Sequence, residues 1–317
     1  MTNNMKRHLL TLYTRTPLHV GSGTSVDVVD LPIMRERITH FPVIPSTSLK
    51  GVLLQHARET FENGQHARAN SIPAEAKALF GAADADGEGD NKKQVSNAGC
   101  VQIMEAKLLA FPVRSLAGAF AWLTCPAVLE RFQRDTGRKF DFPRPAKDQA
   151  AVPGDSVLTI PNQALIVLEE FALATLPAEG AKAKSVADKL KEVCADPLWT
   201  DTIGQRLAVV NDENFQHFAT TCTEVVARIK VDPASRTVDG GALFNQENIP
   251  CETLFYSVLS VVPPHRPVAD GFEANAKLGA LLPAETGKLP ILQVGGDETT
   301  GHGLCEFKRE ELKEVTK

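Results

Sequence analysis

Asp27 and Asp30 stand two apolar residues apart in a glycine-rich stretch, HVGSGTSVDVVD, that begins at His19. Carboxylates in such a loop can ligate a divalent metal or position a 2′-hydroxyl beside a bound phosphodiester. His19 could act there as an acid or a base. The alternative is that one aspartate caps a turn and the histidine only packs. The stretch is therefore a cofactor loop, a nuclease loop or a long connection.

A phosphate-binding surface is predicted just downstream of this loop. The segment PSTSLKGVLLQHARETF (45–61) has apolar residues at helical spacing, which predicts a helix. Its first turn would place free backbone amides, Ser48 and Lys50 at a helix N-terminus, where one phosphate fits. Arg35 and Arg37 lie on the same side of the extended segment before it. The alternative is a polar loop followed by a capped helix.

A second glycine-rich loop, GGDETTGHG (295–303), lies near the C-terminus. Gly295 and Gly296 allow close backbone approach, and Thr299 and Thr300 supply two hydroxyls. This loop is predicted to connect two strands and to contribute to the same phosphate-binding function.

Two common nucleotide-binding motifs are excluded. The glycine pair that follows His19 lacks the third glycine of a dinucleotide-binding loop, because Val26 occupies that position. The pair Gly287-Lys288 is followed by Leu289, where a P-loop requires serine or threonine. The phosphate-binding features therefore belong to neither motif.

Strands and helices interleave along the chain, which predicts an α+β fold. The order strand, helix, strand pair, helix, strand fits a split βαβ, ferredoxin-like core with insertions. The segment from 223 to 244 predicts a β-hairpin with Arg228 and Lys230 on one face. Residues 81–99, rich in Gly, Asp and Asn, are predicted to form a flexible insertion, and 164–175 a single strand.

The composition is typical of a globular protein, with 43% hydrophobic and 23% charged residues. A net charge of −5 argues against a sequence-independent nucleic-acid coat, but the first 60 residues hold seven Lys or Arg and four Asp or Glu. We expect no membrane span and no signal peptide. Six scattered cysteines without a C-x-x-C pair then favour a reduced, cytoplasmic protein.

Several segments, taken in order, closely resemble a known family. They are TPLHVGSGTSVDVVDLPIMRERITHFPVIPSTSLKGVL, LFG, AKLLAFPVRSLAGAFAWLTCPAVLERFQRD, TEVVARI, IPCETLFYSVL and GGDETTGHG. The family is that of the backbone RAMP subunit of the Cmr complex, the type III-B CRISPR effector. The resemblance covers about residues 9–62, 79–136 and 222–308 and is weak between 137 and 221.

The resemblance implies a single RAMP-type domain over residues 1–317, with an RRM-like, ferredoxin-like palm, helical insertions and a β-hairpin thumb at about 224–250. It implies that copies of the chain stack along a CRISPR RNA beside other Cmr subunits. It also implies endoribonuclease activity on the target RNA that pairs with this guide. The alternatives are a non-catalytic RNA-binding scaffold and, more remotely, a metabolic phosphate enzyme with a small-molecule pocket.

By position, the essential loop aspartate of the family is Asp30, and we expect it also to hold a divalent metal, Mg or Mn. Asp27 stands where the family often has glycine. Ile38 and His40 stand where it often has histidine and glycine, so no histidine chemistry carries over to this turn. Glu247, in NQENIP, is a weaker catalytic candidate beside His19. The residues expected to bind RNA are Arg35, Arg37, Ser48, Lys50, Arg228, Lys230, Gly295, Gly296, Thr299 and Thr300.

Overall fold

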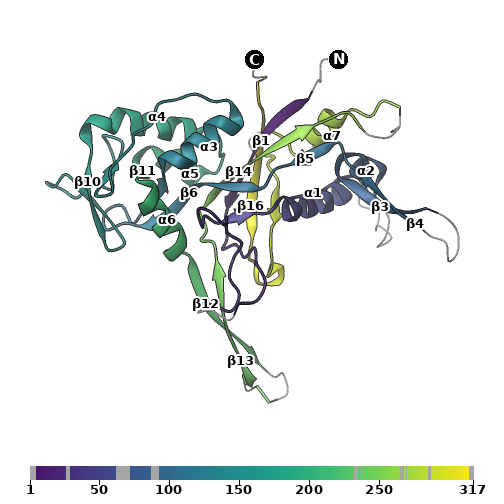
Figure 1. The fold of residues 1–317 in the computed structure, drawn as a ribbon, viewed down its shortest axis with the longest axis horizontal. Helices are drawn as coiled ribbons and strands as arrows, with labels where there is room; N and C mark the ends of the chain where they lie inside the picture. Colours follow the sequence, from purple (N-terminus) through teal and green to yellow (C-terminus); the bar gives the residue numbers. More distant parts are fainter. Residues whose placement is uncertain are drawn as a thin grey trace.

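The computed structural model describes residues 5–25, 29–61, 72–86, 93–231, 235–236, 238–264, 268, 270–284 and 287–313, without the side chains of 82–86, 93–97, 230–231 and 238–242. Figure 1 shows a central sheet, a helical lobe on one side of it, a smaller group of helices on the other, and a long hairpin that projects below. Both ends of the chain lie at the edge opposite the hairpin.

The centre of the sheet has the βαββαβ order of a ferredoxin-like fold. Its four main strands run in the spatial order β16-β1-β14-β6, and each pairs antiparallel with its neighbour. This arrangement confirms the predicted α+β palm. In chain order the elements are β1 (Lys6–Thr14), α1 (Ser46–Phe61), β6 (Ala106–Arg114), β14 (Leu254–Val261), α7 (Ala274–Leu281) and β16 (Leu304–Glu311).

Burial explains why these segments form the centre of the molecule. Strand β1 is buried at every position from His8 to Thr14, as expected for a strand that is covered on both faces. Helix α1 buries Leu49, Leu53 and Ala57, which recur every four residues and so share one face. Three short strands and one helix complete this region: β2 (Val43–Ile44), β5 (Val101–Ile103), β15 (Ile291–Gln293) and α2 (Ala74–Phe80).

The helical lobe extends the same sheet beyond β6. Trp122 and Trp199 meet edge to face in its core, with ring centroids 4.8 Å apart. The extension brings the sheet to twelve strands. Its elements are β7 (Phe120–Thr124), α3 (Pro126–Thr136), β8 (Gln149–Ala151), β9 (Leu165–Leu168), β10 (Phe171–Thr175), α4 (Gly180–Lys191), α5 (Pro197–Arg206), β11 (Leu207–Val210) and α6 (Asp212–Thr221).

One prediction in this lobe is wrong. The segment 164–175 forms the antiparallel pair β9–β10 instead of a single strand. The chain reverses at Glu169, which has a φ of 49°, and the flanking apolar residues continue on both sides of the turn. A turn made by two glutamates has none of the glycine, proline or asparagine that would mark it in the sequence.

The projecting hairpin consists of β12 (Glu224–Val231) and β13 (Val238–Asn248), which confirms the predicted thumb (Figure 1). A second hairpin pairs β3 (Gly81–Asp86) with β4 (Lys93–Ala98), where the sequence predicts an irregular insertion. Its Gly, Asp and Asn content gives no strand signal. None of the described helices is long and apolar enough to cross a membrane. The assignment of the whole chain to one domain stays a prediction.

Candidate functional site

The glycine-rich loop after β1 bonds to the end of β13, at the base of the hairpin, at two points. Leu18 pairs antiparallel with Ile249, and its N–H donates to the Ile249 carbonyl at 2.9 Å. Further along the loop, the N–H of Leu31 donates to the Asn245 carbonyl at 3.0 Å. Two segments of the loop are therefore bonded to the end of β13.

Asp30 lies at this junction and is partly exposed. Its carboxylate Oδ2 accepts a hydrogen bond from the backbone N–H of Asn245 at 2.7 Å. None of the described residues bonds the other carboxylate oxygen, Oδ1. Asp30 thus has one oxygen fixed to the hairpin and one left for a ligand.

His19 is fixed to the same hairpin. Its Nδ1–H donates to the backbone carbonyl of Glu247 at 2.7 Å, so the neutral ring carries its proton on Nδ1 and leaves Nε2 as an acceptor. A Cβ atom at Gly21 would stand 2.8 Å from Nε2. The glycine at position 21 therefore keeps the space in front of the accepting nitrogen open.

Glu247 is buried, with 6% of its surface exposed, and its carboxylate is fully engaged. It accepts hydrogen bonds from the backbone N–H of Ile33 at 3.1 Å and from the Thr223 hydroxyl at 2.7 Å, and it forms an ion pair with Arg35. These contacts join the loop to both strands of the hairpin. They favour a positioning role for Glu247 over direct contact with a substrate.

Arg35 has little left for a ligand. Besides its ion pair with Glu247, its guanidinium donates to the carbonyls of His40 at 2.8 Å and Ala219 at 2.9 Å. The alternation of the segment placed Arg35 and Arg37 on one side but did not show that one of them points into the protein. Arg35 belongs to the contacts between loop and hairpin, and an RNA contact is not expected of it.

The second glycine-rich loop packs against His19. The N–H of Gly296 donates to the His19 carbonyl at 2.9 Å. Gly295 has a φ of +80°, and a Cβ there would stand 2.2 Å from the same carbonyl oxygen. The close approach that Gly295 and Gly296 are predicted to allow is thus made by the chain's own backbone, at His19. Thr299 and Thr300 are both exposed on the short helix η3 (Glu298–Thr300).

Asp297 joins this loop to the other face of the hairpin. Its carboxylate forms an ion pair with Arg228 at 2.9 Å and accepts a hydrogen bond from Gln246 Nε2 at 2.5 Å. Burial alone would raise the pKa of Asp297, but the hydrogen bond from Gln246 and the charge of Arg228 outweigh it and hold that pKa below its usual range. His302 lies 3.4 Å from the Arg228 guanidinium. Sequence reasoning missed Asp297 and His302, although both stand in GGDETTGHG.

The fold and this site now permit a comparison with known proteins. Residues 11–306 match the model of the RAMP superfamily. The chain belongs to the RAMP superfamily. A Pyrococcus furiosus RAMP protein, named CRISPR system Cmr endoribonuclease Cmr4, is 36% identical over 318 residues, which cover 98% of this chain and 97% of that protein. The CRISPR system CMR subunit Cmr4 of Saccharolobus solfataricus is 23% identical, over 92% of this chain and 93% of its own length.

Solved RAMP structures agree with this family assignment. The crystal structure of oligomeric Cmr4 from Pyrococcus furiosus has a TM-score of 0.70 and 30% identity, with 97% of this chain and 99% of that chain covered. A cryo-EM structure of the type III-B Cmr-beta complex bound to cognate target RNA contains a chain with a TM-score of 0.67 and 19% identity, with 96% of each chain covered. The second likeness supports the fold alone. The resemblance inferred from the sequence motifs is confirmed.

The remaining RNA-binding candidates of this RAMP chain lie apart from the junction. Ser48 and Lys50 stand in the first turn of α1, where Ser48 is partly buried and Lys50 is exposed. The side chains of Lys50 and the exposed Arg37 have no hydrogen bond or ion pair with any described residue. Lys230 has no described side chain, and Asp27 lies outside the described residues.

The residues near Asp30 supply few metal ligands. Among the described residues, no three His, Cys, Asp or Glu side chains lie close enough to hold a metal ion. Mg²⁺ at nucleic-acid sites is usually bound by one or two carboxylates, with phosphate oxygens and water completing the shell. Asp30 Oδ1 fits the role of the single carboxylate ligand in such a site. Metal binding stays a prediction.

Proposed function

We propose that this chain is a CRISPR-RNA-binding backbone subunit of a type III-B effector and that it cleaves the target RNA paired with the guide. It works beside further copies of itself and other Cmr subunits. The observation that carries the proposal is the 36% identity, over nearly the whole chain, to a protein named a Cmr endoribonuclease. The junction of loop and hairpin, with His19 and Asp30 on it, is the proposed cleavage site.

The chemistry proposed for this junction is a transfer within the target strand. The 2′-oxygen next to the scissile phosphate attacks phosphorus, the bond to the 5′-oxygen breaks, and the products are a 2′,3′-cyclic phosphate and a 5′-hydroxyl. The proton of the 2′-hydroxyl must pass to a base. His19 Nε2 suits this role because Nδ1 is committed to the Glu247 carbonyl and Gly21 leaves Nε2 accessible.

Asp30 has two possible roles in this scheme. Its free Oδ1 could itself orient or deprotonate the 2′-hydroxyl, or it could bind a divalent cation, Mg or Mn, that stabilises charge on the phosphate. The second role requires a metal-dependent reaction. Cleavage assayed in EDTA and then in Mg²⁺ or Mn²⁺, with RNA binding measured in parallel, separates the two.

Guide binding is proposed for polar groups at the start of α1 and in the second glycine-rich loop. Lys50 and Ser48 lie at the N-terminal end of α1, where backbone amides and the helix dipole favour a phosphate. Thr299 and Thr300 are exposed hydroxyls beside the glycine pair. These groups would contact the sugar–phosphate backbone of the guide RNA. Such contacts do not read the base sequence, which suits a subunit that accepts any guide.

A non-catalytic scaffold is the second candidate, and one observation favours it. The Asp30 carboxylate already has a structural partner in the Asn245 N–H, at 2.7 Å, so a purely positioning role would also explain its presence. Co-expression with partner subunits, followed by sequencing of the RNA that copurifies, tests the shared part of both candidates. Cleavage of a complementary target, and not of an unrelated RNA, then distinguishes the nuclease from the scaffold.

A further inference from the structure

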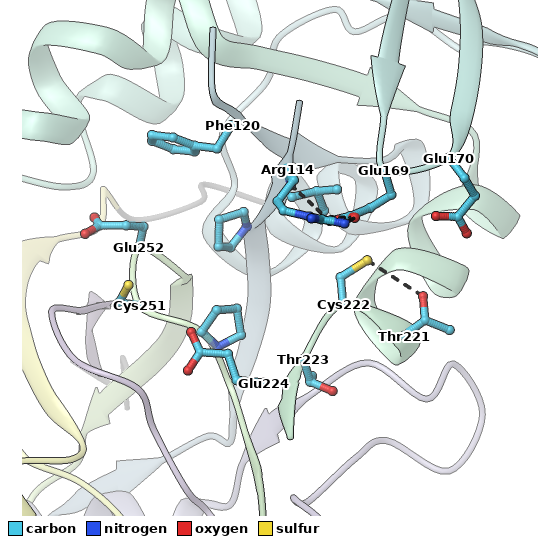
Figure 2. Close-up of a pocket in the computed structure, with 13 residues that line it drawn as sticks. Arg114, Phe120, Glu169, Glu170, Thr221, Cys222, Thr223, Glu224, Cys251 and Glu252 are labelled. Atoms are coloured by element: carbon cyan, nitrogen blue, oxygen red, sulfur yellow. Dashed lines mark hydrogen bonds and ion pairs between the residues drawn. The ribbon is translucent and has the colours of Figure 1, made fainter. Parts of the chain in front are cut away.

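A cavity of about 610 Å³ opens where the helical lobe meets the base of the hairpin (Figure 2). We call it the base cavity. Part of its wall is apolar, made by Pro112 and Phe120 of the palm and lobe and Pro250 after the hairpin. Figure 2 shows Glu224 on one side and the pair Glu169 and Glu170 on the other.

The base cavity has more negative than positive charge. Four glutamates and one arginine line it, and that arginine, Arg114, is already paired with Glu169 through an Nε–Oε2 hydrogen bond of 2.8 Å. The Glu224 carboxylate has no hydrogen bond or ion pair with any described residue, and burial raises its pKa. A cationic guest with an apolar part would satisfy both the carboxylates and the wall, whereas an RNA phosphate would be repelled.

The same chain presents a group of that kind elsewhere on its surface. Residues 36–40, here called the tip turn, lie between Arg35 and Phe41, next to the bridge that pairs Arg35 with Pro42. Ile38 at the tip is 88% exposed, the largest exposed fraction among the large hydrophobic residues described. Arg37 beside it is exposed and has no partner among the described residues. Together they present an apolar side chain beside a positive charge, which is the kind of guest that the base cavity fits.

The tip turn is rigid, which favours docking. Arg131 donates twice to the Glu36 carboxylate, at 2.8 and 3.0 Å, and the N–H of His40 donates to the Glu36 carbonyl at 2.9 Å. Gln216 on α6 donates to the Thr39 carbonyl at 3.0 Å. A turn that is already ordered loses little conformational entropy when it binds.

We propose that the tip turn of one copy docks into the base cavity of a second copy, with Ile38 against the apolar wall and Arg37 beside Glu224 and Glu170. This use of Arg37 replaces the RNA contact that the sequence predicts for it. In a stack of copies this contact is head to tail, so each copy that docks leaves one tip and one cavity free. The inference rests on the proposed stacking of copies and names the surfaces that join them.

The test uses the purified full-length chain, two variants and sedimentation velocity. The tip variant carries Arg37→Glu and Ile38→Asp, which repel the acidic cavity; the cavity variant carries Glu170→Gln and Glu224→Gln, which remove the charges that attract Arg37 without attracting the acidic tip. Circular dichroism and thermal melts check that both fold. Leu116→Asp is the matched control, because Leu116 is also strongly exposed, at 75%, but does not line the cavity.

We expect the wild type and the Leu116 control to form chains of several copies, and each variant alone to weaken association by at least about tenfold. A one-to-one mixture of the two variants has one intact tip and one intact cavity per pair. It should therefore form dimers and nothing longer. A single chain that carries Arg37→Glu and Glu224→Arg should recover longer chains.

Three results would overturn the proposal, and they are distinguishable. If the wild type forms chains and the tip variant does so equally well, the docking is wrong and the stacking stands. If the tip variant forms chains but loses RNA affinity, the tip turn is an RNA surface. If the wild type stays monomeric at every concentration, both the docking and self-association of the free chain fail, while RNA cleavage is still tested separately.

Discussion

The Asp30 carboxylate accepts a hydrogen bond of 2.7 Å from the backbone N–H of Asn245, which ties the glycine-rich loop directly to the projecting hairpin. His19 makes a matching contact, at 2.7 Å, with the Glu247 carbonyl two residues further along the same strand. The two proposed catalytic groups are thus positioned by one strand. Any movement of the hairpin base would carry both of them together.

Arg35→Ala should destabilise the protein without changing how salt affects RNA binding. The side chains of Arg35 and Glu247 are 16% and 8% exposed, so the substitution leaves a buried, unpaired carboxylate. Loss of one partner of such a pair costs about 3 kcal/mol of unfolding free energy. Urea unfolding measures this cost. Arg37→Ala is the matched control, with an expected change within about 0.5 kcal/mol. An Arg35 variant of unchanged stability that binds RNA with a smaller salt slope would contradict this assignment.

Gly295→Ala should destabilise the fold more than Gly301→Ala. Both glycines have positive φ, +80° and +78°, so both substitutions strain the backbone. Only at Gly295 does the added Cβ meet an atom, the His19 carbonyl oxygen at 2.2 Å. We expect an extra cost of about 1–3 kcal/mol and a larger loss of cleavage at Gly295, because His19 must shift. Equal stability and equal activity of the two variants would show that the loop does not position His19.

Because of His8, the unfolding free energy of the protein should decrease as the pH falls below 6.5, the ordinary pKa of histidine. Burial lowers the pKa of His8; its Nδ1 accepts from Arg309 and its Nε2 donates to Asn275, each at 3.0 Å. Above pH 6.5 the imidazole is neutral in both states. Below it, the unfolded chain takes up the proton first, so the unfolding free energy decreases until the folded His8 also titrates.

The check is urea unfolding of the wild type and His8→Gln at about pH 7.5 and about pH 5.5, on either side of the ordinary histidine pKa. The variant should lose less stability than the wild type over this interval. A parallel loss in the two proteins would mean that other groups cause the acid sensitivity.

Lys50→Ala should weaken guide-RNA binding and reduce the log–log salt slope by about one unit, as the loss of one phosphate contact requires. Lys50 is exposed at the start of α1, so its replacement should leave the fold intact. Fluorescence anisotropy at several salt concentrations gives the slope. Lys182→Ala is the control, because Lys182 is an exposed lysine on helix α4 of the lobe. An unchanged salt slope for Lys50→Ala would show that Lys50 does not contact an RNA phosphate.

The palm and hairpin could be predicted because their signals are local. Strand β1 is rich in apolar residues, the apolar face of α1 is periodic in the sequence, and the hairpin strands flank a polar turn. The β9–β10 turn was missed because Glu169 and Glu170 are poor turn markers. Helices α5 and α6 were missed in the weakly matched region, although Asp196 and Asn211 cap them by accepting from Leu198 and Glu213.

The candidate site shows the same limit. The sequence singled out Asp30, His19 and Glu247, and the structure brings all three to the hairpin base. It could not show that Arg35 is turned inward or that Arg228 pairs with Asp297, 69 residues away along the chain. Such contacts depend on which strands lie side by side, which no local pattern encodes.

The substitution Asp30→Asn tests the central claim most directly. Asparagine keeps the size and still accepts the hydrogen bond from Asn245, so assembly and RNA binding should be unchanged, while the charge is lost. We expect target cleavage by the reconstituted complex to slow by about a hundredfold or more. Binding is measured in parallel, and Asp201→Asn on the exposed face of α5 should cut normally. If Asp30→Asn cuts at the wild-type rate, the loop is not the nuclease site and the scaffold function is the better account.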